Sequence, residues 1–221
     1  SPTLKNSLPD PDHLLDMKKA SQMMAQLIKT SGKLGILADF DVDGATSAAI
    51  LINFFRIFNI DPIVHIPDRI KEGYGPNQEA LEKMYEMGAN TIIILDCGTT
   101  NIELFHSFNK CNIIIIDHHV AQESLPNVAA IINPNRQDEK SNYKSLCTAG
   151  LAFLFIISIN RQLRDLGWYQ NSKEPDLFSF LDLVALGTVC DMVPLTGLNR
   201  SYVSQGLKIL NSRSNLGLKV L

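Results

Sequence analysis

The sequence predicts an α/β fold: a doubly wound, mostly parallel sheet with helices on both faces, followed by a helical C-terminal part. Three observations support this prediction. Short runs rich in β-branched residues lack polar alternation, which is typical of parallel strands covered on both faces. In the first part of the chain these runs alternate with helical patterns. From about Ser145 onward the pattern is helical only.

The elements follow in order along the chain. Residues 1–32 form an N-terminal helical segment, in which the periodicity of an amphipathic helix covers 13–30. The sheet region extends over about 33–135, and its expected strands are 34–40, 62–67, 91–96, 112–117 and 129–133. The helices expected between these strands are 45–58, 77–87 and about 101–108. After a polar loop at 136–145, the helical part (about 145–221) has expected helices at 146–165, 177–189 and 200–211.

Length and composition fit a folded domain. A chain of 221 residues with 45% hydrophobic residues is long enough to bury a sizeable core. No apolar run approaches the ~18 residues of a membrane span, and the N-terminus lacks the form of a signal peptide. Four widely spaced cysteines argue against a zinc knuckle or a disulfide framework and favour a reducing cytoplasm. The net charge of −3 gives no overall basic field, so composition alone does not predict a nucleic-acid-binding protein.

Three of the predicted strands end in aspartate. The runs "LGILAD", "TIIILD" and "NIIIID" end at Asp39, Asp96 and Asp117. Open α/β sheets bind ligands at the carboxyl ends of their strands, so these acids should gather at one edge. The loops after the first and the last of these runs add further polar side chains: Asp41, Asp43, His118 and His119. Such a cluster suits Mn²⁺ or Mg²⁺, with zinc or iron as alternatives, and three or more carboxylates suit a two-ion site for a phosphoryl group.

Simpler explanations cover only parts of this pattern. A strand-terminal aspartate is often the N-cap of the next helix, and a histidine more often forms local hydrogen bonds than binds a metal. Residues 39–44 match the start of an EF-hand loop, but its twelfth position is Ile50 and a strand precedes it. "DFDV" at 39–42 also fits haloacid-dehalogenase-like phosphatases, which require a late acidic pair where this chain has "DHH".

Four ordered motifs, "DFDVDGATS", "LDCGTT", "DHH" and "ALGTVCDMVPL", resemble those of the DHH phosphoesterase superfamily. Within it, the stretches at 66–77, 131–136 and 187–200 are most similar to bacterial exonucleases specific for single-stranded DNA. The resemblance implies a metal-dependent 5′→3′ exonuclease that serves DNA repair and recombination. Members of this group usually carry a second domain and an oligonucleotide-binding barrel. Neither is visible here, so we expect residues 33–221 to be the DHH catalytic domain of a longer protein.

The resemblance also implies a role for individual residues. Two divalent cations, Mn²⁺ preferred and Mg²⁺ as the alternative, would share Asp96 and be held by Asp39, Asp41, Asp43, His118 and Asp191. His119 would face the scissile phosphate as a donor, and Asp117 would fix a histidine ring. Candidate contacts to DNA are Arg69, Lys71, Tyr74, Asn133 and Arg136. The small residues that open a later helix could hold a phosphate at Thr148 and Gly150.

The leading hypothesis is therefore an exonuclease on single-stranded DNA. The expected protein is a cytoplasmic monomer that does not bind membranes, with single-strand-binding protein and a helicase as candidate partners. One alternative is a phosphodiesterase that acts on oligoribonucleotides or cyclic dinucleotides with the same site. Another is a non-catalytic scaffold of a replication complex. The presence of every ligand position that the family implies disfavours the scaffold.

Overall fold

One parallel sheet forms the centre of the computed structural model, which describes residues 4–212 and 215–220. Within these residues the sheet has the strand order β2-β1-β3-β4-β5. The strands are β1 (Leu34–Ala38), β2 (Ile63–His65), β3 (Thr91–Leu95), β4 (Asn112–Ile116) and β5 (Ala130–Ile132). All of their pairings are parallel, with Ile36 of β1 opposite Ile93 of β3. The predicted parallel sheet is confirmed.

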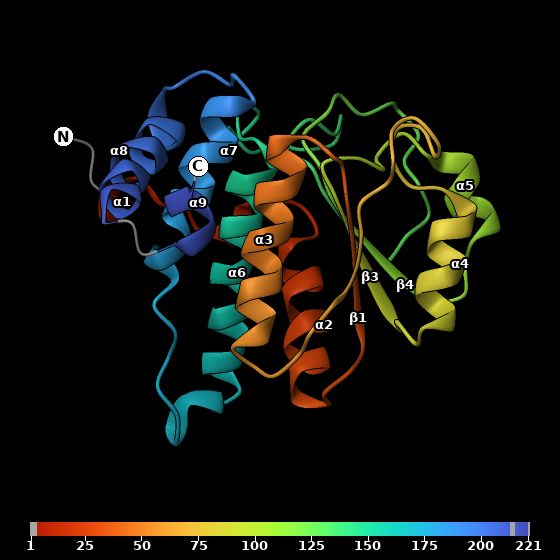
Figure 1. Cartoon of the computed structure of the whole chain (residues 1–221), viewed down its shortest axis with the longest axis horizontal. Coiled ribbons are helices and arrows are strands. Elements are labelled where there is room, and N and C mark those ends of the chain that lie inside the picture. The colour runs from red at the N-terminus through yellow and green to blue at the C-terminus, as the bar shows by residue number, and fades with distance from the viewer. Residues whose placement is uncertain (1–3, 213–214, 221) are drawn as a thin grey trace.

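Helices cover both faces of the sheet, as Figure 1 shows. One face carries α2 (Met17–Lys29), α3 (Val42–Arg56) and α6 (Thr148–Asp165), and the other carries α4 (Gln78–Glu86) and α5 (Ile102–Ser107). Alternate strand residues enter the two cores: Ile36 and Ile93 pack beneath the first set, Leu37 and Ile94 beneath the second. Because both faces are buried, the strands have no need of polar alternation. This confirms the doubly wound arrangement.

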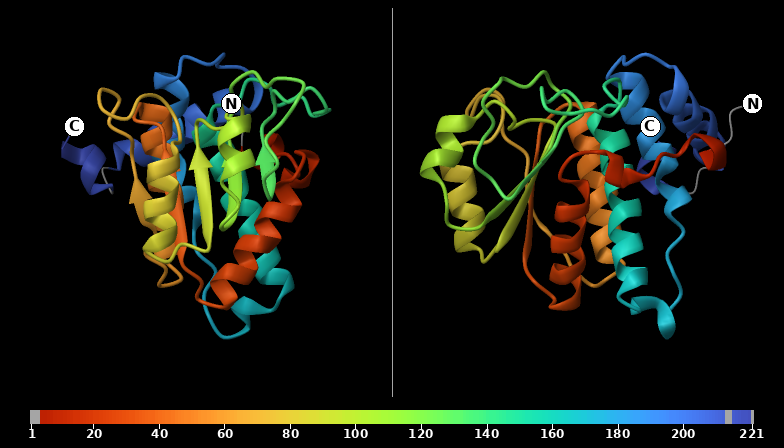
Figure 2. Two further views of the ribbon diagram at one scale, coloured as in Figure 1. Left: turned by 90° about the vertical axis from the view of Figure 1, so that its right-hand side faces the viewer. Right: turned by 180° about the vertical axis from the view of Figure 1, so that it is seen from behind.

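The N-terminal segment and the helical part are built into the same core as the sheet. α6 lies beside α2 on the sheet, as the right-hand view of Figure 2 shows. Next to α3 and α6 lies α7 (Leu181–Cys190), with α8 (Gly197–Asn211) packed on it. The short helices α1 (Leu4–Ser7) and α9 (Leu216–Val220) have no counterpart in the sequence prediction. No helix in the described part of the chain is long and apolar enough to cross a membrane.

Several helix boundaries differ from the prediction. The helix expected at 45–58 begins at Val42, because the Asp41 side chain caps it by accepting a hydrogen bond from the Gly44 amide (2.9 Å). Asp43 therefore lies in the first turn of α3 and not in a loop. The helix expected from residue 13 begins only at Met17, after a left-handed Asp16 (φ 61°). The helices expected from 177 and 200 begin at 181, after a 3-10 turn, and at 197.

Two glycines, Gly44 and Gly187, allow helices to pack closely beside the carboxyl ends of the strands. A Cβ on Gly44 would lie 2.3 Å from the Asp39 carbonyl oxygen, so α3 can start this close to β1 only without a side chain. A Cβ on Gly187 would lie 2.5 Å from Thr46 Oγ1 and 2.7 Å from the Ala149 Cβ. The close approach of α7 to α3 and α6 therefore depends on Gly187.

Gly44→Ala should lower the free energy of unfolding by about 1–3 kcal/mol, because the added methyl group has no space against the β1 end. Gly150→Ala is the matched control. Its Cβ would meet nothing nearer than 3.4 Å, and alanine is favoured over glycine in a helix. Urea unfolding followed by circular dichroism measures both variants. Equal stability of Gly44→Ala and the unmodified chain would contradict the close approach.

Candidate metal centre

The carboxyl ends of β1, β3 and β4 meet at one edge of the sheet, the upper edge in Figure 1. This is where the strand order reverses direction, the usual ligand position in such sheets. β1 leads into Asp39, β3 into Asp96 and β4 into Asp117. The ladder continues through them: the Asp39 amide donates to Leu95 O (3.1 Å) and the Asp96 amide to Ile116 O (2.9 Å). The parallel register thus sets the three strand-terminal acids side by side.

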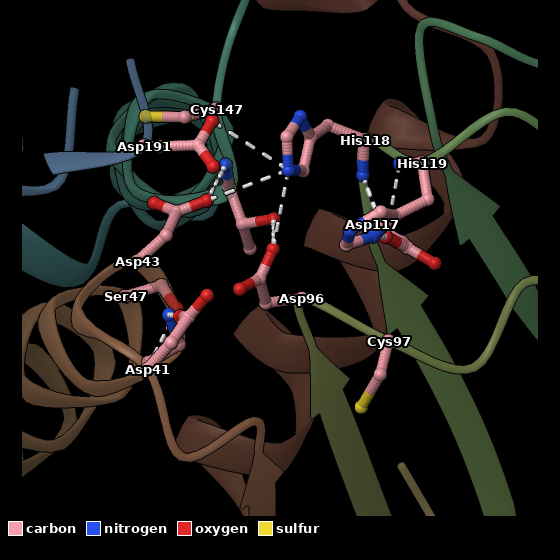
Figure 3. Close-up of polar contacts among 12 residues, drawn as sticks. Asp41, Asp43, Ser47, Asp96, Cys97, Asp117, His118, His119, Cys147 and Asp191 are labelled. Atoms are coloured by element: carbon pink, nitrogen blue, oxygen red, sulfur yellow. Dashed lines mark hydrogen bonds and ion pairs between the residues drawn. The ribbon is translucent and has the colours of Figure 1, made fainter. Parts of the chain in front are cut away.

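Potential metal ligands gather above this edge (Figure 3). The ligand atoms of one group lie within 4.8 Å of one another, and the group consists of Asp39, Asp41 and Asp96. A second group, equally compact, consists of Asp43, His118 and Asp191. Asp96 also forms a third group with His118 and His119. Because Asp96 belongs to the first group and His118 to the second, this third group links them. The structure therefore brings together the two ligand sets that the family resemblance implies, and their metal binding remains a prediction.

His118 stands at the meeting point of the carboxylates. Its Nε2 lies 3.4 Å from Asp96 Oδ1, 3.7 Å from Asp191 Oδ2 and 3.8 Å from Asp43 Oδ2. These separations, drawn in Figure 3, are longer than an ordinary N–H···O hydrogen bond. The imidazole is thus surrounded by acids without being firmly bonded to any of them.

The donor set fits a divalent cation. Three buried side-chain atoms at the site have no hydrogen-bond partner among the described residues: Asp39 Oδ1, His118 Nε2 and Asp191 Oδ2. Buried polar atoms in native proteins are nearly always paired, so such atoms require an explanation. Carboxylate oxygens and an imidazole nitrogen that converge on one space are ligands that Mn²⁺ and Mg²⁺ accept.

The N-terminus of α6 binds two acids of the cluster. The amides of Thr148 and Ala149 donate to the two carboxylate oxygens of Asp43 (2.7 and 2.8 Å). Thr148 Oγ1 donates to Asp96 Oδ1 (2.8 Å). Thr148 and Gly150 are buried, and the amides of Thr148 and Ala149 already donate to Asp43, so the structure gives no support to the phosphate contact predicted here. The helix terminus does bind an anion, but the anion is the chain's own carboxylate.

Asp117 orients His119. A hydrogen bond of 2.7 Å joins His119 Nδ1 to Asp117 Oδ1, and the amide of Thr99 donates to Asp117 Oδ2 (3.1 Å). The hydrogen bond to Asp117 raises the pKa of His119 to about 9, so the ring is protonated at neutral pH. The His119 side chain is 49% exposed and is therefore accessible from solvent. As the sequence suggested, Asp117 binds a histidine ring.

The acids of the cluster are costly to ionise without added positive charge. Burial, with the nearby carboxylates Asp43 and Asp41, raises the pKa of Asp96 to about 8. Burial also raises the pKa of Asp39 and of Asp191. Crowded, desolvated carboxylates favour the neutral form unless a cation offsets their charge.

Residues 66–77 contain three of the residues expected to contact DNA: Arg69, Lys71 and Tyr74. The Tyr74 ring meets the His119 ring edge to face, with centroids 6.4 Å apart. The Arg69 guanidinium lies 4.8 Å from the centroid of the Phe40 ring, which separates two of the candidate ligands in sequence. Lys71 is 82% exposed at its side chain. Tyr74 and Arg69 thus border the cluster, whereas Lys71 extends into solvent.

Asn133 and Arg136 form hydrogen bonds within the chain. Asn133 is completely buried, and its Nδ2 donates to Thr99 Oγ1 and to His119 O (both 3.0 Å). The Arg136 side chain is 10% exposed and forms an ion pair with Asp16 (2.9 Å). Both side chains are thus bonded within the chain, and their predicted contact with DNA has no support in this structure. Their sequence signal, polar side chains after a strand, does not distinguish an inward from an outward direction.

Three residues that hold the site together were missing from the predicted set: Thr99, Asn135 and Ala149. Thr99 lies in the "LDCGTT" motif, but a threonine there has no signal of its own. Ala149 acts through its amide, which no side-chain pattern reveals. Only the turn-forming "NPN" at 133–135 gave a signal for Asn135.

A family model described as "DHH family, N-terminal domain" matches residues 33–188. The chain belongs to the DHH family, which removes the haloacid-dehalogenase alternative. The single-stranded-DNA-specific exonuclease RecJ of Salmonella typhimurium is 35% identical over 214 residues, which cover 94% of this chain and 37% of that protein. The RecJ of Bacillus subtilis is 33% identical over 214 residues, covering 96% of this chain and 26% of that protein. The resemblance inferred from the motifs is confirmed.

Solved structures agree with these relatives. A crystal structure of exonuclease RecJ bound to manganese superposes with a TM-score of 0.80 at 27% identity, covering 96% of this chain and 51% of that chain. The Mn²⁺ complex of RecJ from Thermus thermophilus gives 0.74 at 26% identity, covering 97% and 29%. The chain spans little more than a third of the length of the first curated relatives, 37% in each case.

In the metal-free state, Asp96→Asn should become more stable relative to the unmodified chain as the pH rises. The pKa of Asp96 in the folded chain is about 8, above the unfolded value of about 3.9, so ionising this acid costs stability up to that pH. The asparagine side chain of the variant does not ionise in this pH range, so the variant avoids that loss of stability. Melting temperatures in chelator between about pH 5 and 9 measure the difference.

Mn²⁺ should reverse the order near pH 8, since it binds the folded cluster of the unmodified chain and stabilises that state. An exposed control, Asp61→Asn, should show neither trend. A pH-independent difference between Asp96→Asn and the unmodified chain would contradict the electrostatic account.

Proposed function

We propose that this chain is the catalytic part of a metal-dependent exonuclease that hydrolyses single-stranded DNA from the 5′ end, in repair and recombination. The observation that carries the proposal is the cluster of ligand groups with its three unpaired buried atoms. The relatives named as exonucleases specific for single-stranded DNA support the substrate. The fold and the family account for the position of the cluster at the strand ends.

Two divalent cations, Mn²⁺ in preference to Mg²⁺, are part of this proposal. One would be held by Asp39 and Asp41, and Asp96 would be shared. The other would be held by Asp43, His118 and Asp191. When bound, such ions activate a water molecule and offset charge on the phosphoryl group. Structures of related RecJ proteins contain Mn²⁺ or Mg²⁺, which supports ions of this kind.

The chain's own side chains would orient the substrate and supply a proton. His119 carries a proton near neutral pH because of Asp117, and would donate it to the phosphate or to the leaving oxygen. Tyr74 would stack on a base at the border of the cluster. Arg69 and Lys71 would neutralise backbone phosphates.

The remaining parts of the proposal concern the protein as a whole. We expect a cytoplasmic monomer, and the four free cysteines suit a reducing compartment. Single-strand-binding protein and a helicase are the expected partners. Residues 33–221 would act together with the second domain and the oligonucleotide-binding barrel that the resemblance implies.

Digestion of 5′-labelled single-stranded DNA should require Mn²⁺ or Mg²⁺ and should stop in chelator. Asp96→Ala should abolish cleavage with an unchanged circular dichroism spectrum, because loss of the shared ligand separates the ions. Asp61→Ala, on the exposed surface, is the control and should cleave normally. Near-normal cleavage by Asp96→Ala would remove Asp96 from the site.

A dinucleotide offered in the same assay separates the alternatives. Preference for the dinucleotide over long single-stranded DNA would favour the phosphodiesterase for small nucleotides. Absence of metal-dependent cleavage of either substrate would overturn the catalytic proposal and favour the scaffold. Degradation of the long strand from its 5′ end would support the exonuclease.

Binding of single-stranded DNA by this chain should be weak and sensitive to salt. The net charge is −3, and two divalent ions would bring it only to about +1. That charge suffices for one or two phosphates, so log K should fall with log salt with a slope of about −0.7 to −1.4, and Kd should be roughly 1–100 µM at physiological salt. Fluorescence anisotropy between about 50 and 200 mM salt measures both quantities. Submicromolar binding would reveal a DNA track that the net charge conceals.

A further inference from the structure

The turn after β5, formed by Asn133, Pro134 and Asn135, is packed against the loop that carries the two histidines. The Asn135 amide donates to Asn133 Oδ1 (2.8 Å), which closes the turn. Ala121, just after the histidines, donates its amide to Asn135 O (3.4 Å). The side-chain amides of both asparagines are therefore held in place and donate outward from the turn.

The side chains of Asn133 and Asn135 donate hydrogen bonds to the backbones of different histidines. Asn133 Nδ2 donates to the carbonyl oxygen of His119 and to Thr99 Oγ1 (both 3.0 Å). Asn135 Nδ2 donates to the carbonyl oxygen of His118 (2.5 Å) and to Lys144 O (3.1 Å). Of the two side-chain amides, only that of Asn135 thus bonds the backbone of His118, the histidine whose ring lies among the carboxylates.

The second partner of Asn135 leads to the other half of the cluster. Lys144 precedes α6, whose first amides hold the carboxylate of Asp43. One NH₂ group therefore connects the backbone of His118 to the backbone of the segment that leads into α6. The distance from His118 Nε2 to Asp43 Oδ2 is 3.8 Å.

The base of the turn is fixed from outside the site. The Arg136 guanidinium donates to Ile131 O (2.7 Å) and to Asp16 Oδ2 (2.9 Å), and the Ile131 amide donates to the same Asp16 oxygen (3.0 Å). These hydrogen bonds tie β5 to the N-terminal segment and anchor the turn that follows β5. An anchored turn allows a side chain outside the ligand set to fix the position of a ligand.

We propose that Asn135 is a positioning residue for the metal centre: it sets His118 against Asp43 so that both reach the same cation. Asn135 does not touch the ligand atoms and acts through the His118 backbone and the start of α6. The inference rests on the proposed metal centre. It is tested by metal binding in the absence of DNA, so a failure of DNA cleavage would count against the proposed function alone.

The test is a titration of the chain with Mn²⁺, in which the free ion is measured by electron paramagnetic resonance. In Asn135→Ala the affinity for one Mn²⁺ should fall about 10- to 100-fold, while the other ion keeps its affinity within about threefold. Asn135→Asp has the same shape, cannot donate at neutral pH, and should show the same selective loss. It replaces the alanine variant if that variant fails to fold.

Asn133→Ala is the matched control from the same turn. Asn133 is the more buried of the two and supports the His119 carbonyl, so its loss should lower the melting temperature at least as much as the loss of Asn135. Its Mn²⁺ affinities should nevertheless stay within about threefold of the unmodified chain. Asn127→Ala, on the exposed chain before β5, should change neither quantity.

Three results would overturn the inference. In the first, Asn135→Ala binds both ions as tightly as the unmodified chain. In the second, Asn133→Ala and Asn135→Ala weaken Mn²⁺ binding equally, which would assign the effect to general loosening of the turn. In the third, the unmodified chain binds no Mn²⁺, and Asn135 then has no metal centre to position.

Discussion

Mutual repulsion among buried carboxylates is the constraint around which the strand-end edge of this protein is organised. Two of the acids have their own hydrogen-bond donors: the amides that begin α6 donate to Asp43, and His119 and Thr99 donate to Asp117. Burial, together with the nearby carboxylates of Asp43 and Asp41, raises the pKa of Asp96 to about 8. The N-termini of α6 and α3 supply backbone hydrogen-bond donors to acids at this edge, and the remaining negative charge suits a divalent cation.

The backbone contributes as much to this edge as the side chains do. Asp96 adopts the left-handed conformation (φ 63°), which aspartate tolerates better than most residues, and Gly98 follows with φ 105°. The chain therefore turns sharply as it leaves β3, and the carboxylate of Asp96 reaches Thr148 on α6. Sparsely populated conformations of this kind often occur at functional sites, where the surrounding structure supports them.

The division into a sheet region and a helical part does not coincide with the organisation of the site. The strands supply Asp39, Asp96 and Asp117, but the support for Asp43 comes from α6 and Asp191 comes from the end of α7. Gly187 lets α7 approach closely enough for that contribution. The N-terminal segment takes part indirectly, since Asp16 holds the end of β5 and the turn that follows it. The site is thus a property of the whole fold and not of one region.

The amino-acid sequence by itself determined the α/β class, the order of the elements, the family and the aspartates that end the strands. These features depend on local periodicity and on motif spacing, which are visible along the chain. The tertiary structure alone decided that Asn133 and Arg136 point inward and that the amides of α6 bind Asp43 rather than a phosphate. Asp43 and Thr148 are 105 positions apart. Their contact, like the direction of a polar side chain after a strand, depends on how distant segments pack, and local pattern carries no information about that packing.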